Sequence, residues 1–275
     1  MFRATSPMPV TGALEQAGGL RPAQAGIALT GSVRPALIAA TLVDLHRRGY
    51  LDLDEVDDGT TRDWILTQST QRRPAGPPDA AEPADVLLRY EKTLLRGLFG
   101  HQQQIRLSGL ASTGGAARAI GRVYRQLDRQ AARRGWLKAR EDPQDPLFRT
   151  LRAFRQDLRR LKSAGPDQWA AGQEYLPYAI AFGLASQWAE QLTGPEPLGG
   201  GVNGVNLSGF WVSACTHIDS AVPAGSREHA ARHSSGTSHL GVPAGHHGGP
   251  ADGHHGGDYG GHHGGFGAGG HGGHF

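Results

Sequence analysis

Residues 33–68 read VRPALIAATLVDLHRRGYLDLDEVDDGTTRDWILTQ and decide the fold that this sequence predicts. The first half carries apolar residues at helical spacing, and a basic last turn leads to Gly49, the residue type that most often ends a helix. The spacing of apolar residues then changes to two, which predicts a strand over 50–54, a turn at 57–59 and a return strand over 62–67. A helix, a glycine stop and a β-hairpin in this order predict the recognition helix and the wing of a winged helix.

A second helix is expected to end with the same pattern. Arginine, arginine, glycine, an aromatic residue and leucine occur at 47–51 and again at 133–137, 86 positions later. We therefore expect Gly135, like Gly49, to adopt a left-handed conformation at a helix end and to precede a strand. The repeat predicts two winged-helix-like units in tandem. The alternative is that helix-stop chemistry alone produces the pattern twice.

The predicted fold class is mainly α with small β-hairpins: tandem winged-helix-like units, a helical extension and a disordered tail rich in glycine and histidine. The tail contains few large apolar side chains, so it cannot bury enough surface to offset the entropy of an ordered chain. We therefore expect truncation after Gly194 to leave the folded part intact. The predicted boundaries are 1–19 for a flexible lead-in, 20–69 for the first unit, 70–84 for a linker, 85–140 for the second unit, 141–194 for the helical extension and 195–275 for the tail.

Two helices are predicted in the extension. One, over 147–161, has apolar residues at heptad-like spacing with arginines around them, so we expect it to pack on the body of the protein. A partner helix or a membrane surface is the alternative site of packing for this helix. The other helix begins near Pro177 and runs to Leu192, with apolar residues on two sides, which is typical of a buried helix.

Basic residues concentrate in the middle of the chain. The 275 residues have a formal net charge of +3, but the segment 118–162 holds fourteen basic residues against five acidic ones. Five of its arginines recur at spacings of four, three, four and four on a helix predicted over 115–134, so they share one face. Such a face favours an anionic partner, which is nucleic acid, lipid headgroups or an acidic protein, and the alternative is a solvated face. The five are Arg118, Arg122, Arg125, Arg129 and Arg133.

The predicted wing is acidic, with carboxylates at Asp54, Glu55, Asp57 and Asp58. These charges repel the phosphates of DNA, which many winged helices contact with a basic wing. We therefore expect nucleic-acid binding through the arginine face to be weak and non-specific.

The C-terminal tail is rich in histidine, with twelve of the chain's fourteen histidines from residue 217 onward. The tetrapeptide HHGG begins at residues 246, 254 and 262, a repeat of eight residues. Neutral imidazole binds Ni²⁺, Cu²⁺, Zn²⁺ and Co²⁺, and glycines between the rings let several of them reach one ion. No cofactor is required, metal binding is expected to be weak, and the alternative is a low-complexity tail without a metal role. The candidate ligands are His246, His247, His254, His255, His262, His263, His271 and His274.

The sequence contains no recognisable catalytic motif and indicates no small-molecule substrate. There is no phosphate-binding loop, nucleophile elbow or metalloprotease motif, and the single cysteine, Cys215, excludes an internal disulfide. The N-terminus lacks the apolar core of a secretory signal, and no run of about twenty apolar residues is present to span a bilayer. These observations favour a non-enzymatic cytoplasmic protein, with peripheral contact to a membrane as an alternative.

Several blocks of the sequence resemble the cytosolic C-terminal part of YciQ-like predicted bacterial membrane proteins. The blocks are RPAQAGIALTG at 21–31, ATLVDLHRRGYLDLDE at 40–55, DWILT at 63–67, LLRYEKTLLRGLF at 87–99 and QEYLPYAIAFGLASQWAEQL at 173–192. The resemblance implies relatives with transmembrane helices before the last block, a place that the basic segment 147–162 takes in this chain. It therefore implies a trimmed member without the membrane segments, in a family whose biochemical role is not established, and it supplies no catalytic residues. Our leading interpretation is an uncharacterised non-enzymatic interaction module whose partner is a protein.

Overall fold

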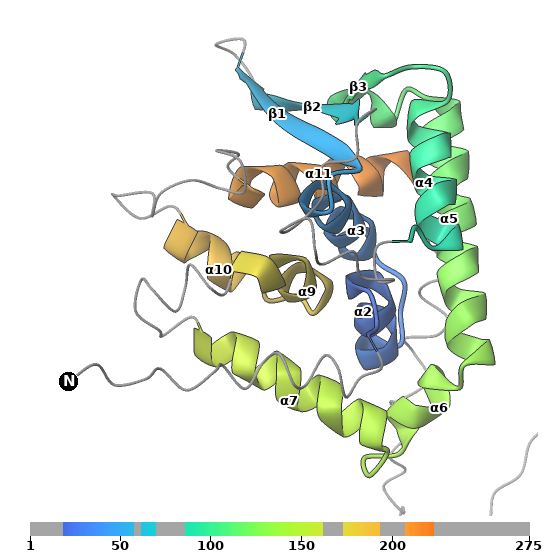
Figure 1. Cartoon of the computed structure of the whole chain (residues 1–275), viewed down its shortest axis with the longest axis vertical. Helices are drawn as coiled ribbons and strands as arrows, with labels where there is room; N and C mark the ends of the chain where they lie inside the picture. Colours follow the sequence, from blue (N-terminus) through green and yellow to red (C-terminus); the bar gives the residue numbers. More distant parts are fainter. Residues whose placement is uncertain (1–18, 58–61, 70–85, 162–172, 193–206, 223–275) are drawn as a thin grey trace, which may run out of the picture. The chain divides into compact units, whose positions relative to one another are not determined.

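Helix α3 (Pro35–Arg47) lies in the middle of the fold, with other elements packed around it (Figure 1). The structure is a computed structural model that describes residues 19–57, 62–69, 86–161, 173–192 and 207–222. The elements that pack on α3 include helices α2 (Pro22–Thr30), α9 (Leu176–Ala181) and α11 (Leu207–Ala221) and strand β1 (Leu51–Asp57). Most side chains of α3 are therefore buried: Leu37, Ile38, Ala39, Ala40, Thr41, Leu42, Val43, Leu45 and His46.

Small residues let α2 approach both α3 and α9 closely. A Cβ atom on Gly26 of α2 would lie 2.5 Å from a methyl carbon of Leu37 and 3.0 Å from the Cβ of Ala181. The same helix is buried along almost its whole length, because it lies between α3, α9 and the helices that follow along the chain. Any side chain at Gly26 would separate these three helices, so the absence of one at this position allows the tight packing.

Glycines with positive φ end several of the helices in the described parts of the chain. Gly49 has φ 72° after α3, and the N–H of Tyr50 donates to the carbonyl of Leu45 at 2.9 Å, which is the bond of a Schellman cap. Gly135 also has φ 72°, and Gly183 has φ 74°. Gly49 and Gly135 thus have the left-handed conformation that the repeated pattern predicts.

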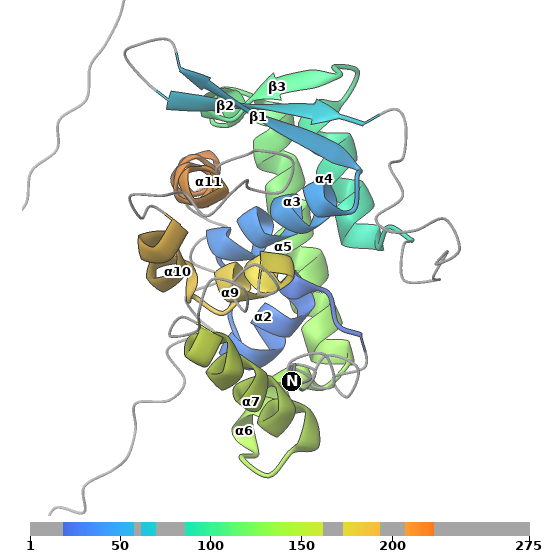
Figure 2. The same cartoon turned by 60° about the vertical axis from the view of Figure 1, so that its left-hand side comes forward.

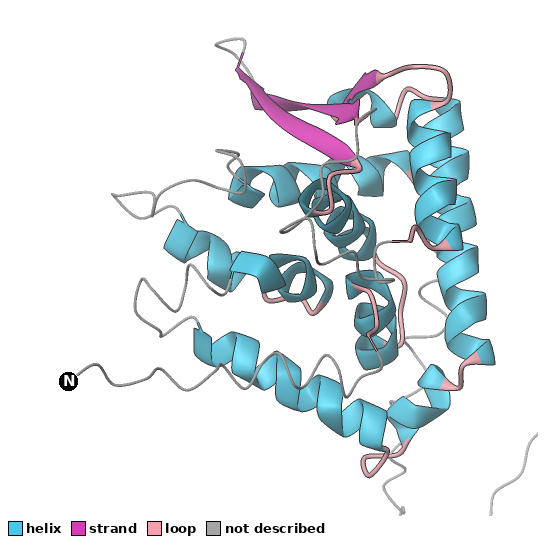
Figure 3. Cartoon of the chain, in the orientation of Figure 1, coloured by secondary structure: helices cyan, strands magenta, loops and turns pink. Residues whose placement is uncertain are grey.

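The chain then forms a hairpin, as predicted, and a third strand from a distant part of the sequence completes a sheet. Strand β1 pairs antiparallel with β2 (Arg62–Gln68), and β2 pairs antiparallel with β3 (Gln104–Arg106). The strands lie together beside the helices, which make up most of the described residues (Figure 3). Because β3 belongs to the second predicted unit, the stretches 20–69 and 85–140 share one sheet. The sheet directs Leu51, Leu53, Trp64 and Leu66 into the core.

Helices α4 (Arg89–Phe99) and α5 (Gly114–Arg133) form the tightest helix pair of the second stretch. A Cβ on Gly97 of α4 would overlap the methyl group of Ala119 on α5, so the two backbones meet at this point. The one-turn helix η2 (Ser108–Leu110) joins β3 to α5. The pair therefore fixes α5, whose apolar side faces α4 and α2.

The predicted strand after Gly135 is wrong, because residues Trp136–Glu141 form helix α6. In this helix the N–H of Ala139 donates to the carbonyl of Gly135 at 2.9 Å. The first glycine is followed by Tyr-Leu-Asp-Leu-Asp, in which apolar and acidic residues alternate with period two from the leucine on, whereas the second is followed by Trp-Leu-Lys-Ala-Arg-Glu. Leucine, lysine, alanine, arginine and glutamate are all good helix formers, so the chain starts a new helix instead of a hairpin. The tandem repeat is therefore a repeat of a helix stop, not of a complete winged-helix unit.

The buried helix predicted from Pro177 to Leu192 is two helices, α9 and α10 (Ala185–Leu192), preceded by the short helix η3 (Gln173–Tyr175). Gly183 separates them, and the N–H of Leu184 donates to the carbonyl of Ala179 at 2.8 Å to close a second Schellman cap. The apolar pattern on either side of Gly183 obscured the break, because glycine is tolerated within helices at a modest cost.

Helix α7 (Pro146–Leu161) packs its apolar stripe on the body, as expected. Leu151, Phe154 and Leu158 are fully buried. The ring of Phe154 meets the rings of Tyr175 and Phe182 edge to face, at centroid distances of 6.0 and 5.6 Å. These apolar residues are therefore not available to enter a membrane or to pack on a partner helix.

Part of the predicted disordered tail is a helix of the core. Helix α11 lies inside the 195–275 segment and packs against α3, next to the sheet (Figure 2). Phe210, Ala214 and Ile218, at a spacing of four, are fully buried, and the Phe210 ring meets Trp64 edge to face at 5.3 Å. The composition of the tail as a whole, averaged over many glycines, concealed this short apolar pattern. The rest of the predicted tail, and the predicted linker, lie outside the described residues.

Removal of α11 is expected to destabilise the protein, contrary to the expectation from composition. Loss of a buried phenylalanine alone costs about 3–5 kcal/mol, and truncation after Gly194 also exposes the side of α3 that α11 covers. We expect thermal denaturation to show a melting temperature lower by roughly 10 °C or more for this truncation. Truncation after Ser238, which keeps α11, serves as the control and should melt within about 2 °C of the full chain. Equal melting temperatures for all three proteins would contradict the role given to α11.

Candidate anion-binding surfaces

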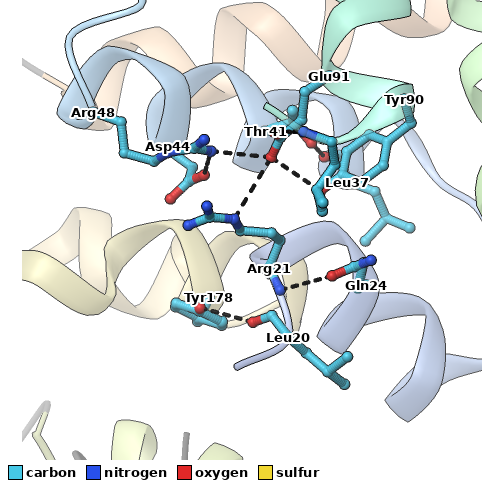
Figure 4. Close-up of polar contacts among 11 residues, drawn as sticks. Leu20, Arg21, Gln24, Leu37, Thr41, Asp44, Arg48, Tyr90, Glu91 and Tyr178 are labelled. Carbon is cyan, nitrogen blue, oxygen red and sulfur yellow. Dashed lines mark hydrogen bonds and ion pairs between the residues drawn. The ribbon is translucent and has the colours of Figure 1, made fainter. Parts of the chain in front are cut away.

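A buried ion-pair network joins the start of α2, the end of α3 and the start of α4 (Figure 4). The Glu91 side chain has no exposed surface, and its Oε1 lies 3.0 Å from Nη1 of Arg48 and 4.0 Å from Nε of Arg21. The same Nη1 of Arg48 lies 2.9 Å from Oδ2 of Asp44, and the N–H of Leu88 donates to Oε2 of Glu91 at 2.7 Å. The carboxylate of Glu91 is therefore paired and hydrogen-bonded on both oxygens.

The electrostatics of this network favour a structural role. Burial lowers the pKa of Arg48, but the charges and hydrogen bonds of Asp44 and Glu91 outweigh burial, so the pKa is raised overall. Burial and the charge of Glu91 raise the pKa of Tyr90, so its hydroxyl stays protonated at neutral pH. Tyr178 also stays protonated, and its hydroxyl donates to the carbonyl of Leu20 at 2.9 Å. These groups hold charge and protons in place where the three helices meet.

Ser108 and Asp63 form a second polar contact, between η2 and β2. The Ser108 hydroxyl donates to Oδ2 of Asp63 at 2.6 Å, and the N–H groups of Ser108 and Trp64 donate to Oδ1 at 3.1 and 2.7 Å. Burial raises the pKa of Asp63, but these hydrogen bonds and the nearby charge of His217 outweigh burial and lower it overall. Because the serine proton goes to a carboxylate rather than to a histidine base, the contact lacks the geometry of a serine nucleophile.

The arginine face predicted on α5 is exposed along its whole length. Its opposite side carries the buried residues that pack on α4 and α2, so the helix cannot turn to hide the arginines. None of the five guanidinium groups forms an ion pair with a carboxylate of the described residues. The helix and its apolar side agree with the sequence prediction, whereas a role for the arginines in binding stays a prediction. The five exposed residues are Arg118, Arg122, Arg125, Arg129 and Arg133.

A shallow hollow of about 250 Å³ lies on the α5 face, where α4 and α5 cross. Gly97 leaves room at the crossing, and Nε2 of Gln126 donates to the hydroxyl of Thr93 at 3.1 Å across it. Arg96 of α4 and Arg122 of α5 line the hollow together. Sequence analysis of α5 alone missed Arg96, because only the crossing of the two helices brings it beside the predicted face.

A larger cavity of about 600 Å³ lies along the outer side of α7. Four arginines line it at spacings of three, three and four residues, which places them on one side of the helix. The spacing is visible in the sequence, but the prediction for this helix considered only its apolar side. The residues that line it are Arg149, Arg152, Ala153, Arg155, Gln156 and Arg159.

The predicted metal ligands, from His246 to His274, lie outside the described residues. Within the described parts of the chain, no group of three or more histidine, cysteine, aspartate or glutamate side chains is placed to hold a metal ion. Cys215 lies on α11, where burial raises the pKa of its thiol to about 11 against the opposing effect of Arg34. The thiol is therefore protonated at neutral pH, which makes it a poor nucleophile and a poor metal ligand.

Comparison with known proteins assigns neither a family nor a function to this chain. No protein-family model, curated protein or solved structure matches this chain. Among the helices of the described ranges, none combines the length and the apolar character needed to cross a membrane.

The buried network is expected to behave as one unit in unfolding experiments. Replacing Arg48 by methionine leaves the buried Glu91 carboxylate without its 3.0 Å partner and should lower the free energy of unfolding by about 3–5 kcal/mol. Replacing Glu91 by leucine leaves Arg48 paired with Asp44 and should cost less. The double variant Arg48→Met/Glu91→Leu should lose clearly less than the sum of the two single variants, because it buries no orphaned partner of that pair. Urea denaturation measures all three.

A matched control uses the exposed pair of α7. Nη1 of Arg160 lies 3.3 Å from Oδ1 of Asp157, and such pairs contribute at most about 1 kcal/mol. Removing either partner should therefore change stability little. Additive losses at Arg48 and Glu91 would show that the two side chains do not act together.

Proposed function

We propose that this chain is a non-enzymatic interaction module that binds an anionic partner through the outer face of α5. The observation that carries the proposal is the row of five exposed guanidinium groups on one packed helix, none of them paired with a described carboxylate. Charges without a partner among the described carboxylates are available to a partner outside the protein, and a fixed helix presents them at constant spacing. The resemblance of the sequence to YciQ-like proteins supplies no catalytic residue.

An acidic protein surface fits this face better than a DNA groove. A winged helix reads DNA with an exposed recognition helix, whereas α3, which precedes the hairpin, is buried by α2, α9 and α11. Strand β1 also exposes Asp52, Asp54 and Glu55, which repel phosphates. Residues 20–69 are therefore winged-helix-like only in the order of their helix and hairpin. Nucleic acid is the second candidate partner, and we expect it to bind weakly through its phosphate backbone. A cytoplasmic location, with peripheral contact to an anionic membrane, is compatible with the same charges.

Binding to two model polyanions tests the proposal. Fluorescently labelled polyglutamate represents an acidic protein, and labelled duplex DNA represents nucleic acid. We expect the full chain to bind polyglutamate at about 50 mM salt and to lose affinity steeply as salt rises. DNA binding should be weaker and independent of base sequence. The test variant changes four arginines of α5 to glutamine, and it should lose most of the binding to both probes. The four positions are Arg118, Arg122, Arg125 and Arg129.

A control variant with the same change in net charge separates the face from overall charge. It replaces four exposed arginines that lie on other elements, namely Arg62, Arg89, Arg106 and Arg160. We expect this variant to keep most of its affinity. If both variants lose the same affinity, the binding depends on net charge and not on the α5 face. If the full chain binds neither probe, the proposal is refuted.

A second candidate function, binding of transition metals by the tail, rests on the HHGG repeat of the sequence. Imidazole must be neutral to bind a metal, and its unperturbed pKa is about 6.5, so occupancy should be low near pH 5 and high near pH 7.5. Copper should bind more tightly than nickel and zinc, and magnesium and calcium should not bind. Calorimetry on a tail peptide covering 246–274 measures this. Absence of nickel and copper binding at pH 7.5, or binding that persists at pH 5, would refute it.

A further inference from the structure

We propose that the hollow at the crossing of α4 and α5 holds one carboxylate side chain of the acidic partner, between Arg96 and Arg122. The inference rests on the function proposed for the α5 face and names the point on that face where a single acidic side chain is recognised. The hollow has described walls on two sides, because the residues that line it come from both helices. They are Thr93, Arg96 and Gly97 of α4 and Arg122 and Gln126 of α5.

The two helices that form the hollow are fixed relative to each other. Gly97 of α4 packs so closely on Ala119 of α5 that the space between them does not admit another Cβ atom. Leu94 and Leu98 of α4 and Ile120 of α5 are buried, so neither helix can rotate without exposing its apolar side. The two helices therefore present their arginines at a constant separation, and binding requires no rearrangement of the backbone.

The guanidinium group of Arg122 reaches from α5 to α4. A Cβ atom on Gly97 would lie 3.7 Å from Nη2 of Arg122, so this group lies next to the backbone of α4. The guanidinium group of Arg118, by contrast, stays near its own helix, because its Nη1 would lie 4.0 Å from a Cβ atom on Gly114. Arg96 lines the same hollow from α4. A carboxylate in the hollow therefore meets guanidinium groups from two helices, which the row on α5 alone does not provide.

The positive charge of the hollow has no compensation among the described residues. Neither Arg96 nor Arg122 forms an ion pair with a described carboxylate, and no described residue that lines the hollow is acidic. The other polar residues of the lining are neutral and bonded to each other. Nε2 of Gln126 donates to the hydroxyl of Thr93 at 3.1 Å, and this hydroxyl donates to the carbonyl of Arg89 at 2.9 Å. A carboxylate therefore meets two positive charges and no negatively charged side chain of the described lining.

The size of the hollow favours a carboxylate side chain over a phosphate of duplex DNA. Its volume of about 250 Å³ is below the roughly 300–1,000 Å³ of small-molecule sites, so it takes one side chain rather than a larger ligand. The carboxylate of a glutamate or aspartate lies at the end of a flexible side chain, and in the hollow it accepts charge-assisted hydrogen bonds from both arginines. The phosphates of a duplex belong to a stiff, continuous backbone with one charge per about 3.4 Å on each strand. We therefore expect a duplex to contact the α5 row without entering the hollow.

Binding of labelled polyglutamate and labelled duplex DNA to the full chain at about 50 mM salt tests the inference with single variants. We expect Arg96→Gln to weaken polyglutamate binding about fivefold, the upper end for an exposed ion pair, and to change DNA binding less than twofold. Arg89→Gln is the matched control, because it removes the same charge from an exposed position of α4 outside the hollow, and it should change either affinity less than twofold. Both side chains are exposed, so neither variant should disturb folding.

A double-variant comparison tests whether the two arginines hold the same carboxylate. If they do, Arg96→Gln/Arg122→Gln should weaken polyglutamate binding by less than the product of the two single effects. The effects of Arg89→Gln and Arg122→Gln should multiply, because Arg89 lies outside the hollow.

Three outcomes would overturn the inference. One is an equal effect of Arg96→Gln and Arg89→Gln on polyglutamate binding, and another is independent effects of Arg96→Gln and Arg122→Gln. The third is an Arg96→Gln variant that loses DNA and polyglutamate binding equally, because the hollow then does not select a carboxylate. If polyglutamate binding is lost in the α5 variant with four glutamines but unchanged in Arg96→Gln, the inference fails and the proposed function stands. If the full chain does not bind polyglutamate at all, both fail together.

Discussion

Helix α3 carries apolar side chains in every direction, and burying all of them requires partners on every side. Helices α2, α9 and α11 and strand β1 supply these partners, although they come from both ends of the described chain. Burial of so many leucine, isoleucine and valine side chains is the main source of stability available to this fold, at about 25 cal/mol for each Å² of apolar surface removed from water. The remaining helices then occupy positions that this central packing leaves, including α5 and α7 with their arginine rows.

Arginine plays two different parts in this structure. Arg48 lies inside the protein and is matched by Asp44 and Glu91, so its charge stabilises the junction of three helices and is not available to a ligand. The arginines of α5 and of the α7 cavity have no such partner among the described carboxylates, and the apolar sides of their helices keep them pointing outward. A protein that retains uncompensated charge on rigid helices is suited to bind anions with little conformational cost. This contrast, rather than any catalytic geometry, is the basis for both binding proposals.

Local patterns in the sequence predicted the local structure well. The stop at Gly49, the hairpin that follows, and the helices α5 and α7 all depend on periodicity and glycine chemistry within a few turns of chain. The predictions failed where that information was incomplete: residues after Gly135 form a helix, and Gly183 splits a long apolar segment.

Features that depend on distant contacts were not predictable in this way. Pairing of β3 with β2 and packing of Phe210 on Trp64 join residues that are far apart in the sequence. The composition of the tail hid α11, because averaging over many glycines masks one short amphipathic helix. The row of α5 arginines was predicted from spacing, whereas the contribution of Arg96 and the cavity on α7 arise only from the way helices cross and pack.

Amide hydrogen exchange, followed by mass spectrometry or NMR, tests the central claim that α3 is enclosed by α11 as well as by α2 and α9. If the packing is as described, the amides of α3 exchange only through global unfolding, and those of 210–218 are protected well above the level of an isolated helix. Both should lose protection together as urea is added. Amides of 210–218 that exchange at the rate of an unstructured chain, while α3 stays protected, would show that α11 is not part of the core and would contradict this account.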